Sequence, residues 1–305
     1  MRNFSIDDIT FVVIGRNEAP NLSRCFVSIK EISSNIIFVD SDSSDSSLEI
    51  AKTHGISKIV ELRSNHYSAG LGRFAGAELV ETRLIQFIDG DQTIEADWPS
   101  CAVEFLNNNE KAAVVHGYKK EYKINYEDFT IKSDKKDHRP DYLQGSFCVV
   151  KEIYTAAGGF DFRFIGQEER DLYIRIHSMG HEVWYHHALM ASHFDFKERG
   201  IRYLFLTDIS VMVLVFLIKA VSTRNFTSYL YVYRRIIPFL PIELASFMLL
   251  VHGLLSNSLE SIAYVVTIQL SALIYAKRIS RIGYFIIWKA ALLNMFRVPR
   301  IMKTD

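Results

Sequence analysis

The 305-residue sequence has only three cysteines, and their placement excludes a disulfide framework. Cys25, Cys101 and Cys148 are odd in number, far apart and without the spacing of metal ligands. Proteins that depend on disulfides carry paired cysteines and fold in an oxidising compartment. The pattern therefore indicates reduced core cysteines in a cytosolic setting.

The sequence also lacks an excess of charge of one sign and an apolar segment near its start. It contains 35 Lys/Arg and 35 Asp/Glu, which gives a formal net charge of zero. Residues 1–10 are polar and acidic, without the apolar core of a secretory signal. We therefore expect the N-terminal part to stay in the cytoplasm.

The charges are distributed unevenly along the chain. Residues 197–305 contain 14 Lys/Arg and 5 Asp/Glu, which leaves 21 and 30 for residues 1–196. The acidic first part argues against nucleic acid as a partner, whereas the basic, apolar second part suits an anionic membrane surface. Because a chain of this length can hold two domains, we expect one over residues 1–198 and another over residues 199–305.

Residues 1–196 alternate short apolar stretches with amphipathic ones, as strands and helices do. The predicted strands cover residues 11–14, 36–39, 58–62, 84–88, 113–118, 145–150 and 182–186. One predicted helix begins near Pro20 and another at Ser44 or Asp45. The 70–83 stretch is predicted to be a loop that runs into a third helix, and two more helices cover 96–107 and 168–179. This order predicts an α/β fold with a mostly parallel, Rossmann-like sheet flanked by helices. The charged stretch 119–140 is expected to be a mobile loop.

Four apolar segments follow residue 200, at 203–220, 236–255, 261–276 and 282–296. A membrane-spanning helix needs about 20 apolar residues, and only 236–255 reaches that length. Basic residues follow 261–276 and are absent from 256–260, so the positive-inside rule predicts a hairpin with the 256–260 loop outside. The other two segments could span the bilayer or lie in its interface. The alternative for these C-terminal hydrophobic helices is a soluble helical domain.

The predicted strand at 84–88 is followed by Asp89, Gly90 and Asp91. Open α/β sheets bind ligands at the carboxyl ends of their strands. Two carboxylates separated by one glycine can hold a hard divalent cation, which usually keeps waters and bridges to substrate phosphates. The alternative is an Asp-Gly turn capped by its own side chains.

The first two predicted strands also end in polar residues. Asn17 and Glu18 follow the first strand, and Asp40 ends the second. In a parallel sheet these residues meet at one edge, where an amide and a carboxylate can pair with the edge of a nucleobase. Each of them alone is typical of a loop or a helix cap.

Together these features resemble family 2 glycosyltransferases, which are inverting enzymes of the GT-A fold. The resemblance covers roughly residues 9–196 and follows the order and spacing of the family's segments. The matching residues are Asn17 and Glu18; Asp40, Ser43 and Asp45; Gly70, Gly72 and Arg73; Asp89 and Asp91; Gly158 to Asp161; and Gly166 to Leu172 with Arg175. Phe74 and Asp42 depart from the Asn and Gly that the family often has.

The resemblance implies roles on the side of the nucleotide-sugar donor. Asp40, helped by Asn17 and Glu18, would contact the nucleobase. Arg73 would approach the diphosphate, and Asp89 would contact the ribose or the shell of the metal.

The resemblance also implies a metal site and a general base. Asp91 would bind Mg²⁺ or Mn²⁺, with His193 as a further ligand, and the cation would neutralise the departing diphosphate. Glu169 would deprotonate the acceptor, with Glu168 beside it, because a helix start stabilises a carboxylate. Glu169 stands where an Asp is commoner, so the choice of base between the two glutamates stays open. The alternatives are a solvated helix start for the glutamates and a packed or solvent-facing side chain for His193.

The predicted function is transfer of a sugar from a nucleotide-diphosphate sugar to a membrane-proximal acceptor, at the cytoplasmic face of a membrane. The acceptor would be a lipid-linked saccharide in surface-polysaccharide assembly. A polyprenyl phosphate is the first alternative, and its ionised oxygen would need little help from a base. A non-catalytic nucleotide-sugar-binding membrane protein would not need Asp89, Asp91 and Glu169, and a nucleotidyltransferase would not need the 168–172 segment. The sugar, the nucleotide and the oligomeric state stay open.

Overall fold

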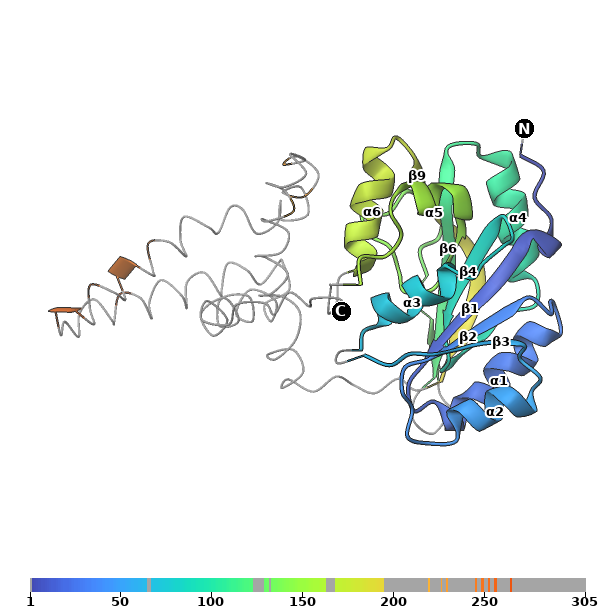
Figure 1. Ribbon diagram of the computed structural model, residues 1–305. Helices are drawn as coiled ribbons and strands as arrows, with labels where there is room; N and C mark the ends of the chain where they lie inside the picture. Colours follow the sequence, from blue (N-terminus) through green and yellow to red (C-terminus); the bar gives the residue numbers. More distant parts are fainter. Residues whose placement is uncertain are drawn as a thin grey trace. The chain divides into compact units, whose positions relative to one another are not determined.

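The computed structural model describes residues 2–64, 67–122, 129–131, 133–162 and 168–194, together with isolated residues between 219 and 264 (Figure 1). The chain divides into two compact units, Met1–Glu198 and Arg199–Asp305. Only the first unit has continuous described segments, so the fold is given for that unit.

One mixed sheet forms the centre of the first unit, and nine of its strands fall within the described segments. Their order is β3-β2-β1-β4-β8-β6-β9-β5, and β7 pairs with β6. The strands are β1 (Ile9–Gly15), β2 (Ile36–Asp40), β3 (Lys58–Glu61), β4 (Leu84–Asp89), β5 (Gln92–Ile94), β6 (Ala112–Tyr122), β7 (Phe129–Ile131), β8 (Phe147–Val150) and β9 (Glu182–His193).

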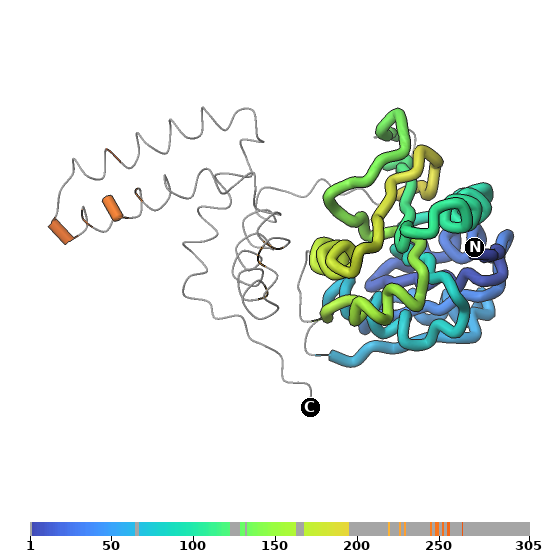
Figure 2. Tube along the Cα trace, turned by 90° about the horizontal axis from the view of Figure 1, so that it is seen from above, coloured from blue at the N-terminus to red at the C-terminus, as the bar shows by residue number. Residues whose placement is uncertain are grey.

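The sheet is parallel only in part, which corrects the prediction of a mostly parallel sheet. Strands β3, β2, β1 and β4 are parallel to one another. Strand β8 is antiparallel to both β4 and β6, and β9 is parallel to β6. Figure 2 shows the blue N-terminal half beside the green-to-yellow half that contains these later strands. The prediction was wrong because an alternation of strands and helices does not reveal the direction of every strand. A strand that joins the sheet without a crossover helix can run antiparallel to its neighbours.

Helices cover both faces of the sheet (Figure 1). The described helices are α1 (Ala19–Lys30), α2 (Ser47–Thr53), α3 (Ala69–Ala77), α4 (Trp98–Asn108), α5 (Lys151–Ala156) and α6 (Glu168–Ser178), after the short 3₁₀ helix η1 (Ile6–Asp8). Phe26 of α1 packs edge-on against Phe38 of β2, 5.5 Å between ring centroids. Gly76 of α3 lies against Val12 and Val39, which face the other side of the sheet.

The predicted apolar face of α1 is buried as expected. Pro20 lies in the first turn of the helix, where a missing N–H costs nothing, and Leu22, Cys25, Phe26 and Ile29 are buried. Burying each large side chain contributes roughly 1.5–3 kcal/mol, so this face holds the helix against the sheet and fixes the loop after β1.

Two strands run further than the sequence pattern predicts. The stretch 119–140, expected to be a loop, begins with the last residues of β6, and β7 pairs with them antiparallel. Strand β9 continues to His193 and does not end at 186. The outer part of β6 is only half-buried and consists of three charged residues between Tyr118 and Tyr122. Backbone pairing with β7 and β9 holds it in place, and an apolar pattern does not reveal such pairing.

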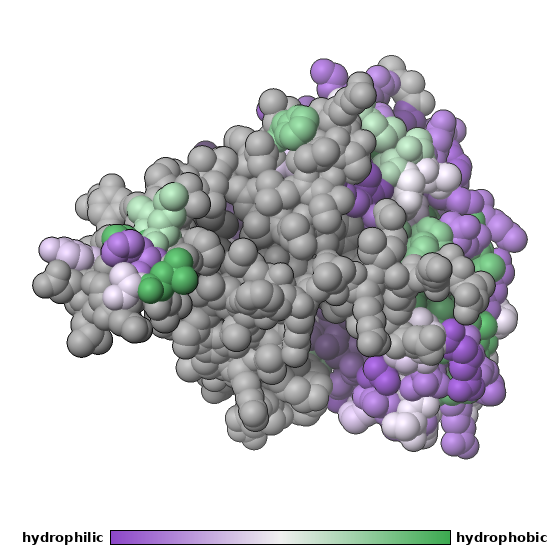
Figure 3. Space-filling view, turned by 60° about the vertical axis from the view of Figure 1, so that its left-hand side comes forward, coloured by the Kyte–Doolittle hydropathy of each residue, from purple (hydrophilic) through white to green (hydrophobic). Residues whose placement is uncertain are grey.

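The apolar segments predicted at 203–220, 236–255, 261–276 and 282–296 lie outside the described residues, apart from isolated positions. Among the helices that the structure does describe, none has the length and apolar character that crossing a bilayer requires. On the face of the first unit shown in Figure 3, the described side chains are mainly hydrophilic, with hydrophobic ones scattered between them.

Candidate active site

The carboxyl ends of β1, β2 and β4 meet at one edge of the sheet. In the parallel register Gly15 pairs with Asp40, and Ile14 pairs with Asp89. The loops that follow these strands therefore lie next to one another. This edge is where an open α/β sheet binds its ligand, and it gathers the polar residues singled out in the sequence.

Hydrogen bonds tie the loops after β1 and β2 together. Asn17 has a left-handed backbone, with φ of 58°, and its N–H donates to Ser43 Oγ at 2.9 Å. Its side-chain oxygen accepts the N–H of Ser44 at 2.8 Å. Asn17 thus holds the loops after β1 and β2 together, and its side-chain oxygen is already hydrogen-bonded to the protein.

Asp40 keeps one carboxylate oxygen available. The side chain is buried, and Oδ2 accepts the N–H of Ser43 at 2.9 Å. Oδ1 is also buried, and no described residue donates a hydrogen bond to it. A buried acceptor without a donor is costly, so this atom is suited to a ligand N–H such as that of a nucleobase.

Arg73 of α3 joins three carboxylates from two other elements. Its side chain is 3% exposed, and Nη2 lies 2.9 Å from Asp89 Oδ1. Nη1 lies 3.3 Å from Glu168 Oε1 and 3.0 Å from Glu169 Oε1. Burial alone would lower the pKa of Arg73, but the three carboxylates raise it above its ordinary value. The cluster holds one positive and three negative formal charges, and the nearby cation Lys119 of β6 adds a second positive charge beside Asp89.

Two glycines allow this cluster to form. A Cβ atom at Gly70 would lie 3.0 Å from Glu168 Cγ, and one at Gly145 would lie 2.7 Å from Arg73 Nη2. Both contacts are shorter than ordinary van der Waals distances. The backbone of α3 and the segment before β8 can therefore approach the buried guanidinium and glutamate only without side chains.

Asp89 and Asp91 have different surroundings although one residue separates them. Asp89 Oδ1 accepts a hydrogen bond from Arg73 Nη2 at 2.9 Å, and its Oδ2 accepts one from Gln92 Nε2 at 3.1 Å. Burial would raise the pKa of Asp89, but the positive charges of Arg73 and Lys119 lower it, so the carboxylate stays ionised. Asp91 Oδ2 lies 3.0 Å from His193 Nε2, whereas its Oδ1 is buried and has no described hydrogen-bond partner.

The chemistry of Asp91 and His193 fits a divalent cation. Burial would lower the pKa of His193, but its hydrogen bond to Asp91 and the charge of that carboxylate raise it. Within the described segments, no three His, Cys, Asp or Glu side chains converge as a ready-made metal site. Mg²⁺ is commonly held by one or two carboxylates together with substrate phosphates and water. Asp91 Oδ1 and the imidazole would supply the protein's share of such a shell, with Asp89 beside them.

The sequence of this unit matches the model of the glycosyl transferase family 2 over residues 10–163, just over half of the chain. The chain belongs to glycosyl transferase family 2. It is a glycosyltransferase, and its sheet with helices on both faces is the GT-A fold. No curated protein sequence matches it significantly.

Solved structures of glycosyltransferases resemble this family 2 enzyme in fold. A structure of GalNAc-T7 with UDP, GalNAc and Mn²⁺ has a TM-score of 0.51 and 13% identity, covering 62% of this chain and 44% of that one. S. aureus TarS gives 0.53 and 14%, over 68% and 39%. TarS residues 1–349 give 0.57 and 12%, over 94% and 91%. The enzyme thus spans less than half the length of the first two, and at these identities the likeness concerns the fold.

The two glutamates of the enzyme differ in exposure. Both lie in the first turn of α6 and accept hydrogen bonds from Arg73. The Glu168 side chain is 4% exposed, whereas that of Glu169 is 22% exposed. The Glu169 carboxylate is therefore the more accessible of the two to solvent.

Lys119 is a site residue that the sequence analysis missed. It lies on β6 beside Ala191, two residues before His193 on β9. Burial lowers the pKa of Lys119, and the charges of Asp89 and Asp91 oppose that effect. The prediction placed Lys119 at the start of a loop, and no local pattern in the sequence marks it as part of the site.

Proposed function

We propose that this glycosyltransferase uses a nucleotide-diphosphate sugar and a divalent cation to glycosylate a saccharide acceptor by inversion. The observation that carries the proposal is the arrangement around Arg73. One buried guanidinium connects Asp89, next to the candidate metal ligand Asp91, with Glu169, the candidate base. The donor side and the acceptor side of the site are therefore held in one unit.

The proposed reaction is a single displacement. An acceptor hydroxyl attacks the anomeric carbon of the donor sugar, and Glu169 takes the hydroxyl proton. The bond from that carbon to the diphosphate breaks, and the nucleoside diphosphate leaves with the bonding electrons. When bound, the cation would neutralise charge on that leaving group. Asp40 would hold the nucleobase, and Asn17 and Glu18 would shape the loop beside it.

The charge of the site favours a hydroxyl acceptor over a phosphate acceptor. Asp89, Glu168 and Glu169 surround the guanidinium of Arg73, and with Asp91 they outnumber the two cations Arg73 and Lys119. A polyprenyl phosphate would bring further negative charge next to Glu169, which costs free energy. A neutral hydroxyl avoids that repulsion and also needs the base that Glu169 provides.

We further propose that the acceptor is lipid-linked and that the enzyme works at the cytoplasmic face of a membrane. The support is the net positive charge of residues 197–305 and the apolar segments within them. Three described residues of those segments, Met248, Leu255 and Tyr264, are 64%, 83% and 64% exposed. Exposed apolar side chains in a part of the chain with net positive charge suit a lipid surface, and surface-polysaccharide assembly supplies saccharides on lipid carriers there.

The test is a donor panel. Purified enzyme is incubated with single nucleotide-sugars and Mg²⁺ or Mn²⁺, with and without a membrane lipid extract, and release of nucleoside diphosphate is measured. We expect one donor to react, and the extract to accelerate release. Release that never depends on a saccharide or lipid acceptor, for any donor, would contradict the proposed transfer.

A further inference from the structure

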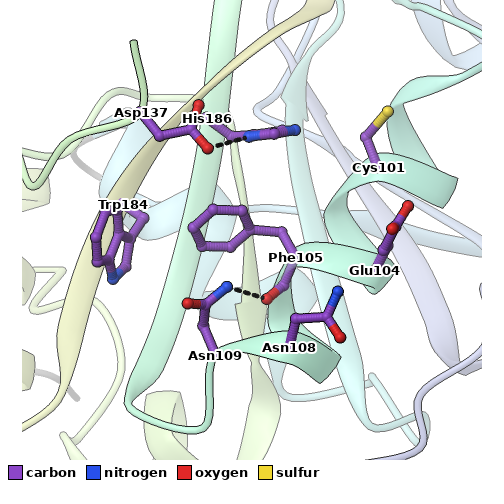
Figure 4. Close-up of a pocket in the computed structure, with 8 residues that line it drawn as sticks. All are labelled: Cys101, Glu104, Phe105, Asn108, Asn109, Asp137, Trp184 and His186. Atoms are coloured by element: carbon purple, nitrogen blue, oxygen red, sulfur yellow. Dashed lines mark hydrogen bonds and ion pairs between the residues drawn. The ribbon is translucent and has the colours of Figure 1, made fainter.

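A second concave site lies on the first unit, away from Asp91 and Glu169. It encloses about 380 Å³ between α4, the start of β9 and the segment before β8. The residues that line it are Cys101, Glu104, Phe105, Asn108, Asn109, Asp137, Trp184 and His186 (Figure 4). Trp184 is near the start of β9 and His193 at its end, so a rise of roughly 3.3 Å per residue separates them by on the order of 30 Å.

Aromatic rings form the apolar part of this hollow. In Figure 4 the Phe105 ring lies between Trp184 and His186. The ring centroids of Phe105 and Trp184 are 5.6 Å apart at an angle of 57°, and those of Phe105 and His186 are 5.1 Å apart. Trp184 Nε1 donates to Glu182 Oε2 at 2.9 Å, which fixes the indole. The rings thus form an apolar surface whose geometry is fixed by the protein itself.

Polar groups surround the rings. Asp137 accepts hydrogen bonds from the His186 ring at 2.8 Å and from the N–H of His187 at 2.7 Å, so it sets the orientation of that ring. Glu104 and Asn108 are exposed on α4, and neither has a described hydrogen-bond partner. These groups can donate to and accept from a ligand that carries hydroxyls.

The thiol in the hollow does not make it a catalytic site. Burial raises the pKa of Cys101, and the charges of Asp97 and Glu104 raise it further. A protonated thiol is a weak nucleophile, so the neighbouring histidine and aspartate do not form an active cysteine centre.

We propose that this hollow is a subsite for a saccharide, namely part of the acceptor chain. A pyranose ring has an apolar face of C–H groups and an edge of hydroxyls, which match the aromatic rings and the carboxylate and amide groups. The Arg139 guanidinium lies 5.7 Å from the centre of the Trp184 ring but is paired with Glu182 at 2.8 Å, so Glu104 and Asp137 leave the hollow with an excess of negative charge that would repel a phosphate or nucleotide. The volume lies near the lower end of ordinary ligand sites, roughly 300–1,000 Å³, which suits one or two sugar rings.

The proposal rests on the proposed function, because a saccharide acceptor gives the subsite its purpose. An acceptor chain long enough to span the roughly 30 Å from the hollow to His193 would have its other end held near the active site, which raises the local concentration of that end. The subsite would then lower the KM for long acceptors more than for short ones.

The experiment uses saturation-transfer NMR on purified full-length enzyme. The probes are monosaccharides and disaccharides of glucose, galactose, N-acetylglucosamine and N-acetylgalactosamine. The variants are Trp184→Ala, the exposed pair Glu104→Gln with Asn108→Ala, and Asp91→Asn in the candidate metal site. Glu49→Gln, exposed on α2, is the matched control.

We expect at least one saccharide to bind the enzyme, the Glu49 variant and the Asp91 variant alike. Its affinity should fall at least tenfold in Trp184→Ala and in the Glu104/Asn108 pair. Retained binding in both of those variants, or absence of binding by every probe, would overturn the subsite. Binding at the hollow in an enzyme that transfers no sugar from any donor would support the subsite while refuting the proposed transfer.

Discussion

At the scale of single residues, the candidate active site is a set of carboxylates that share one guanidinium. Arg73 contacts Glu168 and Glu169 through the same nitrogen, yet the two glutamates differ in exposure. This difference in exposure predicts that removing the charge of Glu168 and removing that of Glu169 change the rate of transfer differently.

Glu169→Gln keeps the shape of the side chain and removes its basicity. Transfer to a hydroxyl acceptor should fall by about 10² to 10⁴-fold, the usual range for loss of a general base, while nucleotide binding persists. Initial rates and nucleotide affinity are measured together, with thermal unfolding as a check on folding. Glu168→Gln is the comparison, and a larger loss of turnover in that variant would place the base at Glu168.

Asp91→Asn tests the metal. The substitution preserves size but weakens the ligand, and metal stabilisation of a leaving group is worth several kcal/mol, so turnover should fall by about 10² to 10⁴-fold. EDTA should abolish activity, and added Mg²⁺ or Mn²⁺ should restore it. Asp97→Asn, an exposed residue before α4, serves as control. Full activity in EDTA would exclude the metal role.

His116 provides a test of stability against pH. It is buried on β6, and burial, with smaller effects of Lys119 and His138, lowers its pKa to about 4. The unfolded chain binds the proton near pH 6.5, so between pH 6.5 and 4 the unfolded state holds more protons and folding stability falls as pH falls. The loss from this residue amounts to about 3 kcal/mol at pH 4.

Replacing His116 with Leu should therefore remove part of the acid sensitivity. Denaturant unfolding at pH 7 and pH 4.5 measures the change in stability between the two pH values for each protein. The exposed His177→Leu variant should keep the wild-type difference. An equal difference in all three proteins would show that His116 titrates in the folded state as it does in the unfolded one.

Part of the site could be predicted from the sequence, and there is a physical reason why the rest could not. Asp40, Asp89 and Asp91 end apolar strands, so a local pattern places them at the ligand-binding edge. The engagement of Arg73 with three carboxylates depends on contacts between α3, β4 and α6, which are far apart in the chain. Lys119 reaches the site only because β6 continues beyond its apolar part.

At the scale of elements, helix α3 packs against β1 and β2 with almost no space. A Cβ atom at Gly76 would lie 2.4 Å from Val12 Cγ1 and 2.9 Å from Val39 Cγ2. At Gly72 in the same helix the nearest atom, Ile14 Cγ2, would be 3.3 Å away. The close approach at Gly76 sets the distance between the sheet and helix α3, which carries Arg73.

Gly76→Ala should destabilise the first unit by roughly 1–3 kcal/mol, because overpacking outweighs the gain of about 1 kcal/mol in helix propensity. Gly72→Ala should be nearly neutral, since a shift of a few tenths of an ångström relieves its contact. Urea unfolding compares the two variants with the wild type. Equal stability of the two variants would mean that α3 can move away from the sheet at little cost.

The elements predicted best are those with a strong apolar signal. Strands β1, β2 and β4 lie in the core, and their residues are almost all buried. The short strand β5 and helix α5 were not predicted, because elements of three and six residues carry too few residues for a periodic pattern. Strand β7 is exposed throughout, so backbone pairing alone identifies it.

At the scale of the whole molecule, the two units carry opposite charge. The first 196 residues are acidic, and residues 197–305 are basic and apolar. The GT-A unit contains the proposed donor site, so the second unit is the part available to bring the enzyme to its acceptor. An acidic catalytic unit alone would be repelled from an anionic membrane.

We predict that residues 199–305 bind the enzyme to a membrane. Partition of even one 20-residue apolar segment, such as 236–255, into lipid is strongly favourable, and each Lys or Arg near an anionic leaflet adds about 1 kcal/mol. Full-length enzyme should sediment with membranes and resist high-salt washing, and resistance to carbonate would indicate insertion of the apolar segments. A chain truncated after Lys197 should be more soluble, still bind nucleotide-sugar, and transfer poorly to a lipid acceptor. Recovery of monodisperse full-length enzyme without detergent would refute the membrane assignment, and with it the main reason for choosing a lipid-linked acceptor over a free saccharide.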